Sequence, residues 1–181
     1  NNAVQKAKDK LAQLIKDAAA GKATTADIEA ATKSLNETVA KAQAALATAK
    51  KTAKSEATVP AYLSDSKSLQ AAADKLAALA GDPNATATDL QNALTAYNKA
   101  KDAAQAAYDA QVKDAKTVVN TGKMTPAKQH LNELLANGAT ASEIAVAMIA
   151  VANEKDTAIA TAAAAPVVSA GIITTMHPTL V

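Results

Sequence analysis

Large apolar residues recur along this chain at intervals that place them on one face of a helix. Val4, Leu11 and Leu14 stand at positions i, i+7 and i+10, separated mainly by alanine and polar residues. Two later segments have the same spacing: Leu69, Leu76 and Leu79, and then Met124, Leu131 and Leu134. Each of the three segments therefore predicts a short amphipathic helix.

A short motif follows each of these predicted helices. Its pattern is A-T-x-x-(D/E)-(I/L), and it occupies residues 23–28, 85–90 and 139–144. In such a capping box the threonine hydroxyl accepts a hydrogen bond from the backbone N–H three residues later, while the carboxylate accepts one from the threonine N–H. The motif predicts that further helices begin near residues 25, 87 and 141.

The helices that begin at these caps are long and continue the apolar spacing. Their large apolar residues are Ile28, Leu35, Val39 and Leu46, then Leu90, Leu94, Tyr97 and Tyr108, and then Ile144, Met148, Val151 and Ile159. A unit of short helix, capped turn and long helix thus occurs three times. The unequal distances between the motifs favour separate modules joined by helix over a strict solenoid.

Glycine and proline residues mark the joins between these units. Pro60 cannot lie inside a helix, so we expect a joint near it. Gly122 ends the second unit, and Thr125-Pro126 provides a cap followed by proline at the first helical position, which predicts a short helix over 126–136. We expect three helical modules and an uncharged tail that is extended or begins a following domain: 1–58, 59–120, 121–165 and 166–181.

The composition supports a helical fold. Of 181 residues, 51 are alanine, and the chain has no Phe, Trp, Cys or Arg. Scarce aromatic and branched residues disfavour a β-sandwich or an α/β core, and the lack of cysteine excludes disulfides and thiolate metal sites. We therefore predict an all-α chain of tandem small helical bundles in an elongated arrangement. Compact packing of all six helices is the alternative.

Charge and hydropathy argue against two classes of partner. The net charge is +2, with lysines and acidic residues interspersed. Nucleic-acid-binding proteins usually concentrate basic residues and add aromatic side chains for stacking, so we expect no nucleic-acid partner. The longest apolar run, near the end of the chain, is about fifteen residues and shorter than a membrane span requires.

Few side chains offer chemistry. His130 and His177 stand alone, no catalytic or phosphate-binding motif is present, and acidic residues are spread singly among lysines. We therefore expect no catalytic, cofactor or metal site, and no enzyme. Tyr62, Tyr97 and Tyr108 are the most distinctive side chains. They are predicted to fill the core with the hydroxyl at its rim, or alternatively to form a contact patch for a protein or sugar.

The repeated short helix, the A-T-x-x-(D/E)-(I/L) motif and the long helix spaced I-x6-L-x3-V-x6-L resemble the FIVAR modules. They are also similar to the albumin-binding type of helical repeat in large surface proteins of Gram-positive bacteria. The resemblance covers residues 1–50 best, 61–112 well and 113–165 moderately. It implies three-helix-type bundles in tandem that are associated with the cell wall and non-catalytic.

This resemblance implies a function of adhesion or spacing on the bacterial surface. We expect an extracellular protein, secreted or attached to the wall, that binds a host extracellular protein or a cell-wall glycan or presents another domain. The alternative is an alanine-rich helical protein that binds ice or a lipid surface. Ice binding predicts a sustained row of threonines at eleven-residue spacing, and lipid binding predicts large apolar residues on the solvent face; neither pattern is found.

Overall fold

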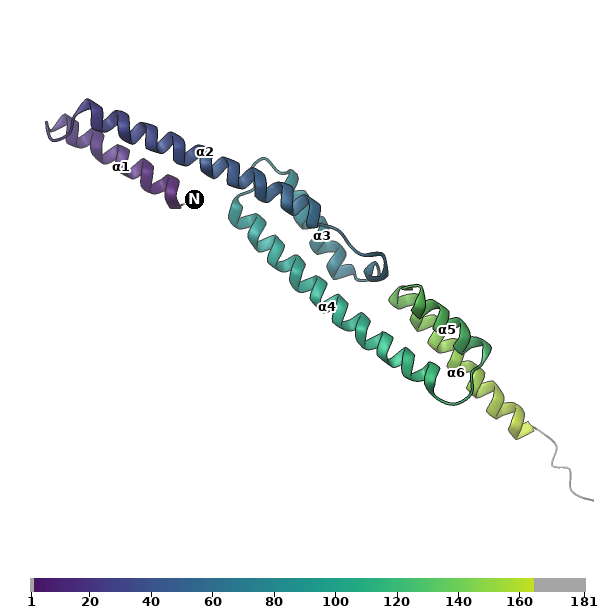
Figure 1. Cartoon of the computed structure of the whole chain (residues 1–181). Coiled ribbons are helices and arrows are strands. Elements are labelled where there is room, and N and C mark those ends of the chain that lie inside the picture. Colours follow the sequence, from purple (N-terminus) through teal and green to yellow (C-terminus); the bar gives the residue numbers. More distant parts are fainter. Residues whose placement is uncertain (1, 165–181) are drawn as a thin grey trace, which may run out of the picture. The chain divides into compact units, whose positions relative to one another are not determined.

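The structure of the chain is a computed structural model that describes residues 2–164, apart from the side chains of Asp156 and of residues 158–164. This part of the chain is entirely helical and contains no strand (Figure 1). Its elements are α1 (Asn2–Ala19), α2 (Thr25–Glu56), the 3₁₀ helix η1 (Ala61–Leu63), α3 (Lys67–Gly81), α4 (Ala87–Asn120), α5 (Pro126–Ala136) and α6 (Ala141–Ala164). The all-α prediction is confirmed. The predicted tail and His177 lie outside the described residues.

The predicted helix starts are confirmed. The three capped helices α2, α4 and α6 begin at Thr25, Ala87 and Ala141. Helix α5 begins at Pro126, and the side chain of the preceding Thr125 accepts a hydrogen bond from a backbone N–H of the first turn. These positions are determined locally, because a cap needs only residues within one helical turn.

A glycine in the left-handed conformation follows two of the three short helices. Gly21 has φ 71° and Gly138 has φ 67°, in the left-handed region that favours glycine over residues with a side chain. Helix α3 ends differently. Gly81 is its last helical residue, and Asp82 follows it in an extended conformation.

The chain divides into two compact units, Asn1–Ala110 and Gln111–Val181, and the boundary falls inside helix α4. We describe each unit by itself, the second only as far as residue 164. The module boundaries expected after residues 58 and 120 remain predictions.

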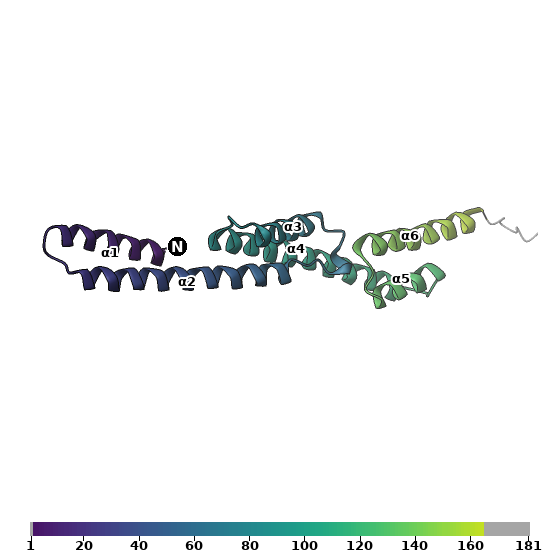
Figure 2. The same ribbon diagram turned by 90° about the horizontal axis from the view of Figure 1, so that it is seen from above.

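In the first unit, helices α1 and α2 form an antiparallel hairpin in which α1 lies along the first part of α2 (Figure 2). No residue of α1 is buried. Along the part of α2 that faces it, the one buried residue is Ala31. The larger apolar side chains of this hairpin are half-buried, apart from the exposed Ile15, so this part of the unit has little core.

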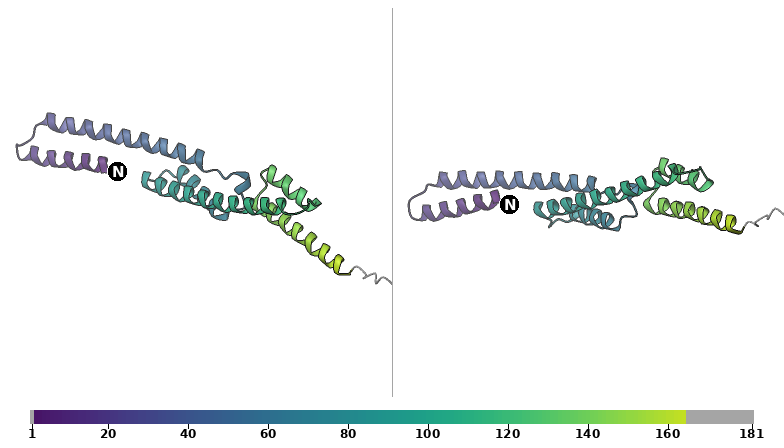
Figure 3. Two further views of the ribbon diagram at one scale, coloured as in Figure 1. Left: turned by 60° about the horizontal axis from the view of Figure 1, so that its bottom comes forward. Right: turned by 90° about the horizontal axis from the view of Figure 1, so that it is seen from below.

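The main core of the first unit lies further along, where the last turns of α2 pack with α3 and with the first half of α4. Leu69 and Leu76 of α3 are fully buried there, next to Leu90 and Tyr97 of α4. Helix α2 contributes Ala53, with Leu46 and Ala49 packed against the cluster. Helix α2 therefore packs against α1 along its first part and against α3 along its last part (Figure 3).

The segment around Pro60 is packed against this core. Pro60 caps η1, and Leu63 at the end of η1 is buried. The Tyr97 hydroxyl donates a hydrogen bond of 2.6 Å to the backbone oxygen of Thr58. These contacts hold the segment to α4, whereas the sequence alone predicts a joint.

The second unit contains the end of α4 with α5 and α6, and α5 packs antiparallel to α6 (Figure 1). Its buried apolar residues come from all three helices: Ala115, Val119, Leu131, Ile144, Ala147 and Val151. The Gln111 side-chain amide donates a hydrogen bond of 2.8 Å to the backbone oxygen of Ala141, which ties α4 to the start of α6.

Candidate functional sites

The three A-T-x-x-(D/E)-(I/L) motifs are helix caps. In the first, the Thr24 N–H donates to Asp27 Oδ2 (2.8 Å) and the Asp27 N–H donates to Thr24 Oγ1 (3.2 Å). The same pair of hydrogen bonds is present in the other two motifs, between Thr86 and Asp89 and between Thr140 and Glu143. These carboxylates satisfy backbone donors at exposed helix starts, which accounts for the motif without a ligand.

The cap hydrogen bonds also affect ionisation. Hydrogen bonds from the Thr24 side chain and backbone hold the pKa of Asp27 below its ordinary value of 3.8, and Thr86 does the same for Asp89. Because the pKa of these carboxyl groups is lowered in the folded state, their contribution to folding stability is present above the ordinary pKa. It is lost as the pH falls through the folded-state pKa. The caps of α2 and α4 are therefore expected to weaken only in acid.

Replacing the cap of α4 gives a direct test of this assignment. Thr86→Ala removes the acceptor for the Asp89 N–H, and we expect a loss of about 1 kcal/mol in stability. Thr95→Ala is the control, because Thr95 lies exposed inside α4 and its hydroxyl only donates to Gln91 O. Chemical denaturation followed by circular dichroism compares the two. Equal effects of both substitutions would contradict the cap.

The three tyrosines occupy two different environments. Tyr97 is 2 % exposed and lies in the core of the first unit, with its hydroxyl bonded to Thr58. This agrees with the core interpretation, and a partner could reach Tyr97 only if the core opened. Tyr62 and Tyr108 are half-buried at the edge of that core, so they are better placed to contact a partner.

Tyr62 and Tyr108 form an aromatic pair. Their ring centroids lie 4.9 Å apart with an interplanar angle of 52°, a favourable tilted arrangement. The Tyr62 hydroxyl donates a 2.7 Å hydrogen bond to Gln105 Oε1, and the Gln105 amide donates to Asp109 Oδ1 at 2.8 Å. The pair therefore has a fixed geometry and a partly exposed surface, and it is the candidate contact site of the first unit.

Burial raises the pKa of Tyr108 above its ordinary value of 10.0, with smaller contributions from the nearby Tyr62 and Asp109. Because the pKa of Tyr108 is raised in the folded state, the contribution of its neutral hydroxyl to folding stability is complete below pH 10. This contribution is lost as the pH rises through the folded-state pKa. We expect ultraviolet titration of the folded protein to show a late-ionising tyrosine that Tyr108→Phe removes. A titration curve that Tyr108→Phe leaves unchanged at its late end would contradict the assignment.

A second candidate site is a cavity of about 610 Å³ in the second unit, between the end of α4, the start of α5 and the middle of α6. Apolar side chains such as Val118, Met148 and Val151 form much of its wall. Lys128 also lines it and is only 8 % exposed. The Lys128 ammonium donates hydrogen bonds to Thr121 O and to Lys123 O, which places a positive charge at the carbonyl end of α4.

Glu154 lines the same cavity from α6. Its Oε1 accepts a hydrogen bond of 3.2 Å from the Ala127 N–H in the first turn of α5, while its Oε2 is buried and has no hydrogen-bond partner. Lys128 and Glu154 thus bind the end of one helix and the start of another. These roles are structural, and the cavity offers one free carboxylate oxygen among mainly apolar side chains.

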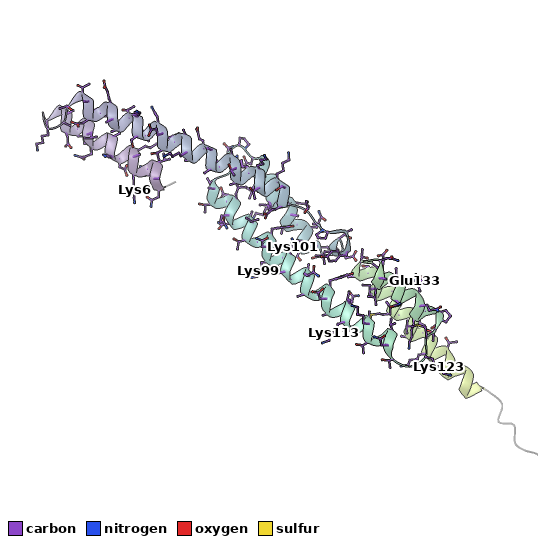
Figure 4. All side chains as sticks on the ribbon, in the orientation of Figure 1. Lys6, Lys99, Lys101, Lys113, Lys123 and Glu133 are labelled. Atoms are coloured by element: carbon purple, nitrogen blue, oxygen red, sulfur yellow. The ribbon has the colours of Figure 1, made fainter. Side chains whose placement is uncertain are left out.

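Many of the other charged side chains are exposed to solvent. Lys6, Lys99, Lys101, Lys113, Lys123 and Glu133 are all exposed (Figure 4). His130 is also exposed, on α5. Within the described residues no group of three or more His, Cys, Asp or Glu side chains could hold a metal ion. None of the described helices has the length and apolar character needed to cross a bilayer.

Comparison of the chain with protein-family models, with curated proteins and with solved structures gives no match. The resemblance to FIVAR modules and albumin-binding repeats therefore remains a prediction that rests on the motifs themselves.

Sequence reasoning missed Lys128, Glu154 and Gln111. Each is a polar residue in a helix, and nothing in the local pattern separates it from the exposed lysines, glutamates and glutamines around it. The signal for Lys128 is weak but present, since it falls on the apolar face three residues before Leu131. Such a position is expected to be partly buried.

Proposed function

We propose that the chain is a non-catalytic segment of tandem helical bundles that acts as a spacer or adhesin at a bacterial surface. The observation that carries the proposal is the use of α2 in two packing groups. One continuous helix of 32 residues packs against α1 and then against α3. A spacer built in this way needs no flexible linker between the two groups.

Helix α4 supports the same interpretation. Its 34 residues are divided between the two compact units, so the boundary between them lies within a helix. At 1.5 Å per residue, helices of this size are each about 50 Å long. We propose that consecutive bundles share long helices in an elongated array.

The chemistry of the side chains supports a binding or spacing role over catalysis. The conspicuous carboxylates cap helices, and the buried Lys128 and the half-buried Glu154 hold helix ends. The proposed location is extracellular, secreted or attached to the cell wall. The partner is a host extracellular protein or a cell-wall glycan, with the Tyr62–Tyr108 pair as the candidate contact.

Small-angle X-ray scattering tests the spacer geometry. A compact protein of this length has a radius of gyration of about 16 Å. We expect a clearly larger value and a maximum dimension greater than the length of either long helix. A radius near 16 Å would overturn the elongated array.

Adhesion is tested separately, by binding of the chain to immobilised serum albumin, matrix proteins and cell-wall glycans. We expect binding to one of these ligands that the double substitution Tyr62→Ser and Tyr108→Ser weakens. Lys99→Ser is a matched surface control, since Lys99 is exposed on α4. An elongated chain that binds none of the ligands would leave the spacer role alone.

A further inference from the structure

The three repeats allow equivalent positions to be compared within one protein. Alignment on the caps places Ile28, Leu90 and Ile144 at the same position of the three long helices. Alignment of the short helices pairs Leu11 with Leu76 and Leu131. A difference in burial between such positions reflects what covers them, because the residue types are nearly the same.

The first repeat is much less buried than the other two at these positions. Leu76 and Leu131 are fully buried, whereas Leu11 is only half-buried. Leu90 and Ile144 are buried, whereas Ile28 is half-buried. The apolar residues of the α1/α2 hairpin that have this intermediate burial form what we call the hairpin face: Val4, Leu11, Leu14, Ile28, Leu35 and Val39.

Ile15 extends the contrast. It is 53 % exposed, while the equivalent Ala80 and Leu135 are half-buried. An exposed isoleucine next to a row of half-buried leucines forms a larger apolar surface than an isolated residue would. Such a surface is typical of a site for another protein segment.

The two repeats in which the equivalents of Leu11 and Ile28 are buried each have a third helix on this face. In the first unit the third helix is the last part of α2, which places Leu46, Ala49 and Ala53 against α3 and α4. In the second unit it is the last part of α4, where Ala115 and Val119 are buried with α5 and α6. Both covering segments are rich in alanine and present small apolar side chains at helical spacing.

The covering helices share a polar contact as well. The Lys50 ammonium donates to Asp82 O (2.6 Å), and the Gln111 amide donates to Ala141 O (2.8 Å). Both acceptors lie at the turn between a short and a long helix. A covering helix is thus recognised by its small apolar face and by one side-chain donor that reaches this turn.

We propose that the hairpin face is a docking site for a third helix supplied by another repeat of this kind. The occupant is the last part of a long helix: an alanine-rich amphipathic helix with a large residue followed by alanines at helical spacing, and a lysine or glutamine directed to the α1–α2 turn. It completes a three-helix bundle with α1 and α2. The expected packing of this helix is that of the ends of α2 and α4 against the second and third repeats.

The test appends a second copy of residues 44–57 to the start of the full chain, through a flexible Gly/Ser linker of about 10 residues that keeps the segment at high effective concentration. The measurement is amide hydrogen exchange followed by mass spectrometry. We expect exchange in α1 to slow by about tenfold or more, as for a segment whose opening has become less favourable. Exchange in α3 and α5 should not change, because their faces are already covered.

Two controls make the result decisive. In the same fusion with Leu46→Asp and Ala53→Asp in the appended copy, amide exchange in α1 should be as fast as in the unmodified chain. Leu11→Asp in the hairpin should abolish the slowing by the unchanged segment. Unchanged exchange in α1, or equal slowing by the Asp-bearing segment, would overturn the proposal.

Sedimentation of the unmodified chain tests the main competing occupant. The proposal expects a monomer, since the covering segments at the ends of α2 and α4 are already packed within each molecule. A dimer whose α1 is protected from exchange would mean that a second copy covers the hairpin face, and would overturn the proposal. Neither outcome bears on the elongated array, which scattering tests independently.

Discussion

Leu76→Ala is expected to destabilise the first unit by about 2–5 kcal/mol, as a truncation at a fully buried leucine. Leu76 is fully buried in the cluster formed by α2, α3 and α4. The core around it is small and contains several alanines, so the lost contacts have few neighbours to replace them. Because the chain has two compact units, hydrogen exchange resolved by segment is a better measure than one melting temperature.

Leu11→Ala is the matched control for this prediction. It removes the same atoms from the equivalent position of the first repeat, where the side chain is half-buried. We expect a loss of about 1 kcal/mol, because less surface returns to water and no closed cavity forms. Equal losses for Leu11→Ala and Leu76→Ala would contradict the difference in burial between the two repeats.

Tyr97→Ala is expected to cost about 3–5 kcal/mol, because it removes the largest buried side chain of the core. Tyr97→Phe separates the hydroxyl from the ring. It deletes only the hydrogen bond to Thr58 O, and we expect a loss of about 1 kcal/mol. The loss of stability should be at the low end for a deleted hydrogen bond, since Thr58 is exposed and water can bond to its backbone oxygen instead.

Tyr62→Phe provides the comparison for the hydroxyl. It removes a hydrogen bond to Gln105 at the half-buried edge of the core, so its effect is expected to be smaller than that of Tyr97→Phe. Faster hydrogen exchange in η1 and at the end of α2 should accompany Tyr97→Phe alone. If Tyr97→Phe leaves these segments unchanged, the hydroxyl is not what holds the Pro60 segment to α4.

The candidate sites were only partly predictable. Spacing identified the three tyrosines, but periodicity cannot distinguish a core position such as Tyr97 from an edge position such as Tyr108. The two lie eleven residues apart on one face of α4. Their difference comes from tertiary packing, because Tyr97 lies inside the cluster formed by α2, α3 and α4, whereas Tyr108 lies at its edge against Tyr62. Likewise, the contacts of Lys128 and Glu154 depend on the helix ends that pack beside them, at the end of α4 and the start of α5.

The sequence by itself determined where the helices begin and end. The caps at Thr24, Thr86 and Thr140, the left-handed glycines and the proline at the start of α5 act within about one helical turn, so a local pattern is sufficient to specify them. Only the tertiary structure decided how deeply each repeat is buried. Leu11 and Leu76 have the same local pattern, yet Leu76 is covered by the end of α2 and Leu11 is not. Burial depends on a helix from another part of the chain, and the spacing of residues within one helix carries no information about which helix will pack against it.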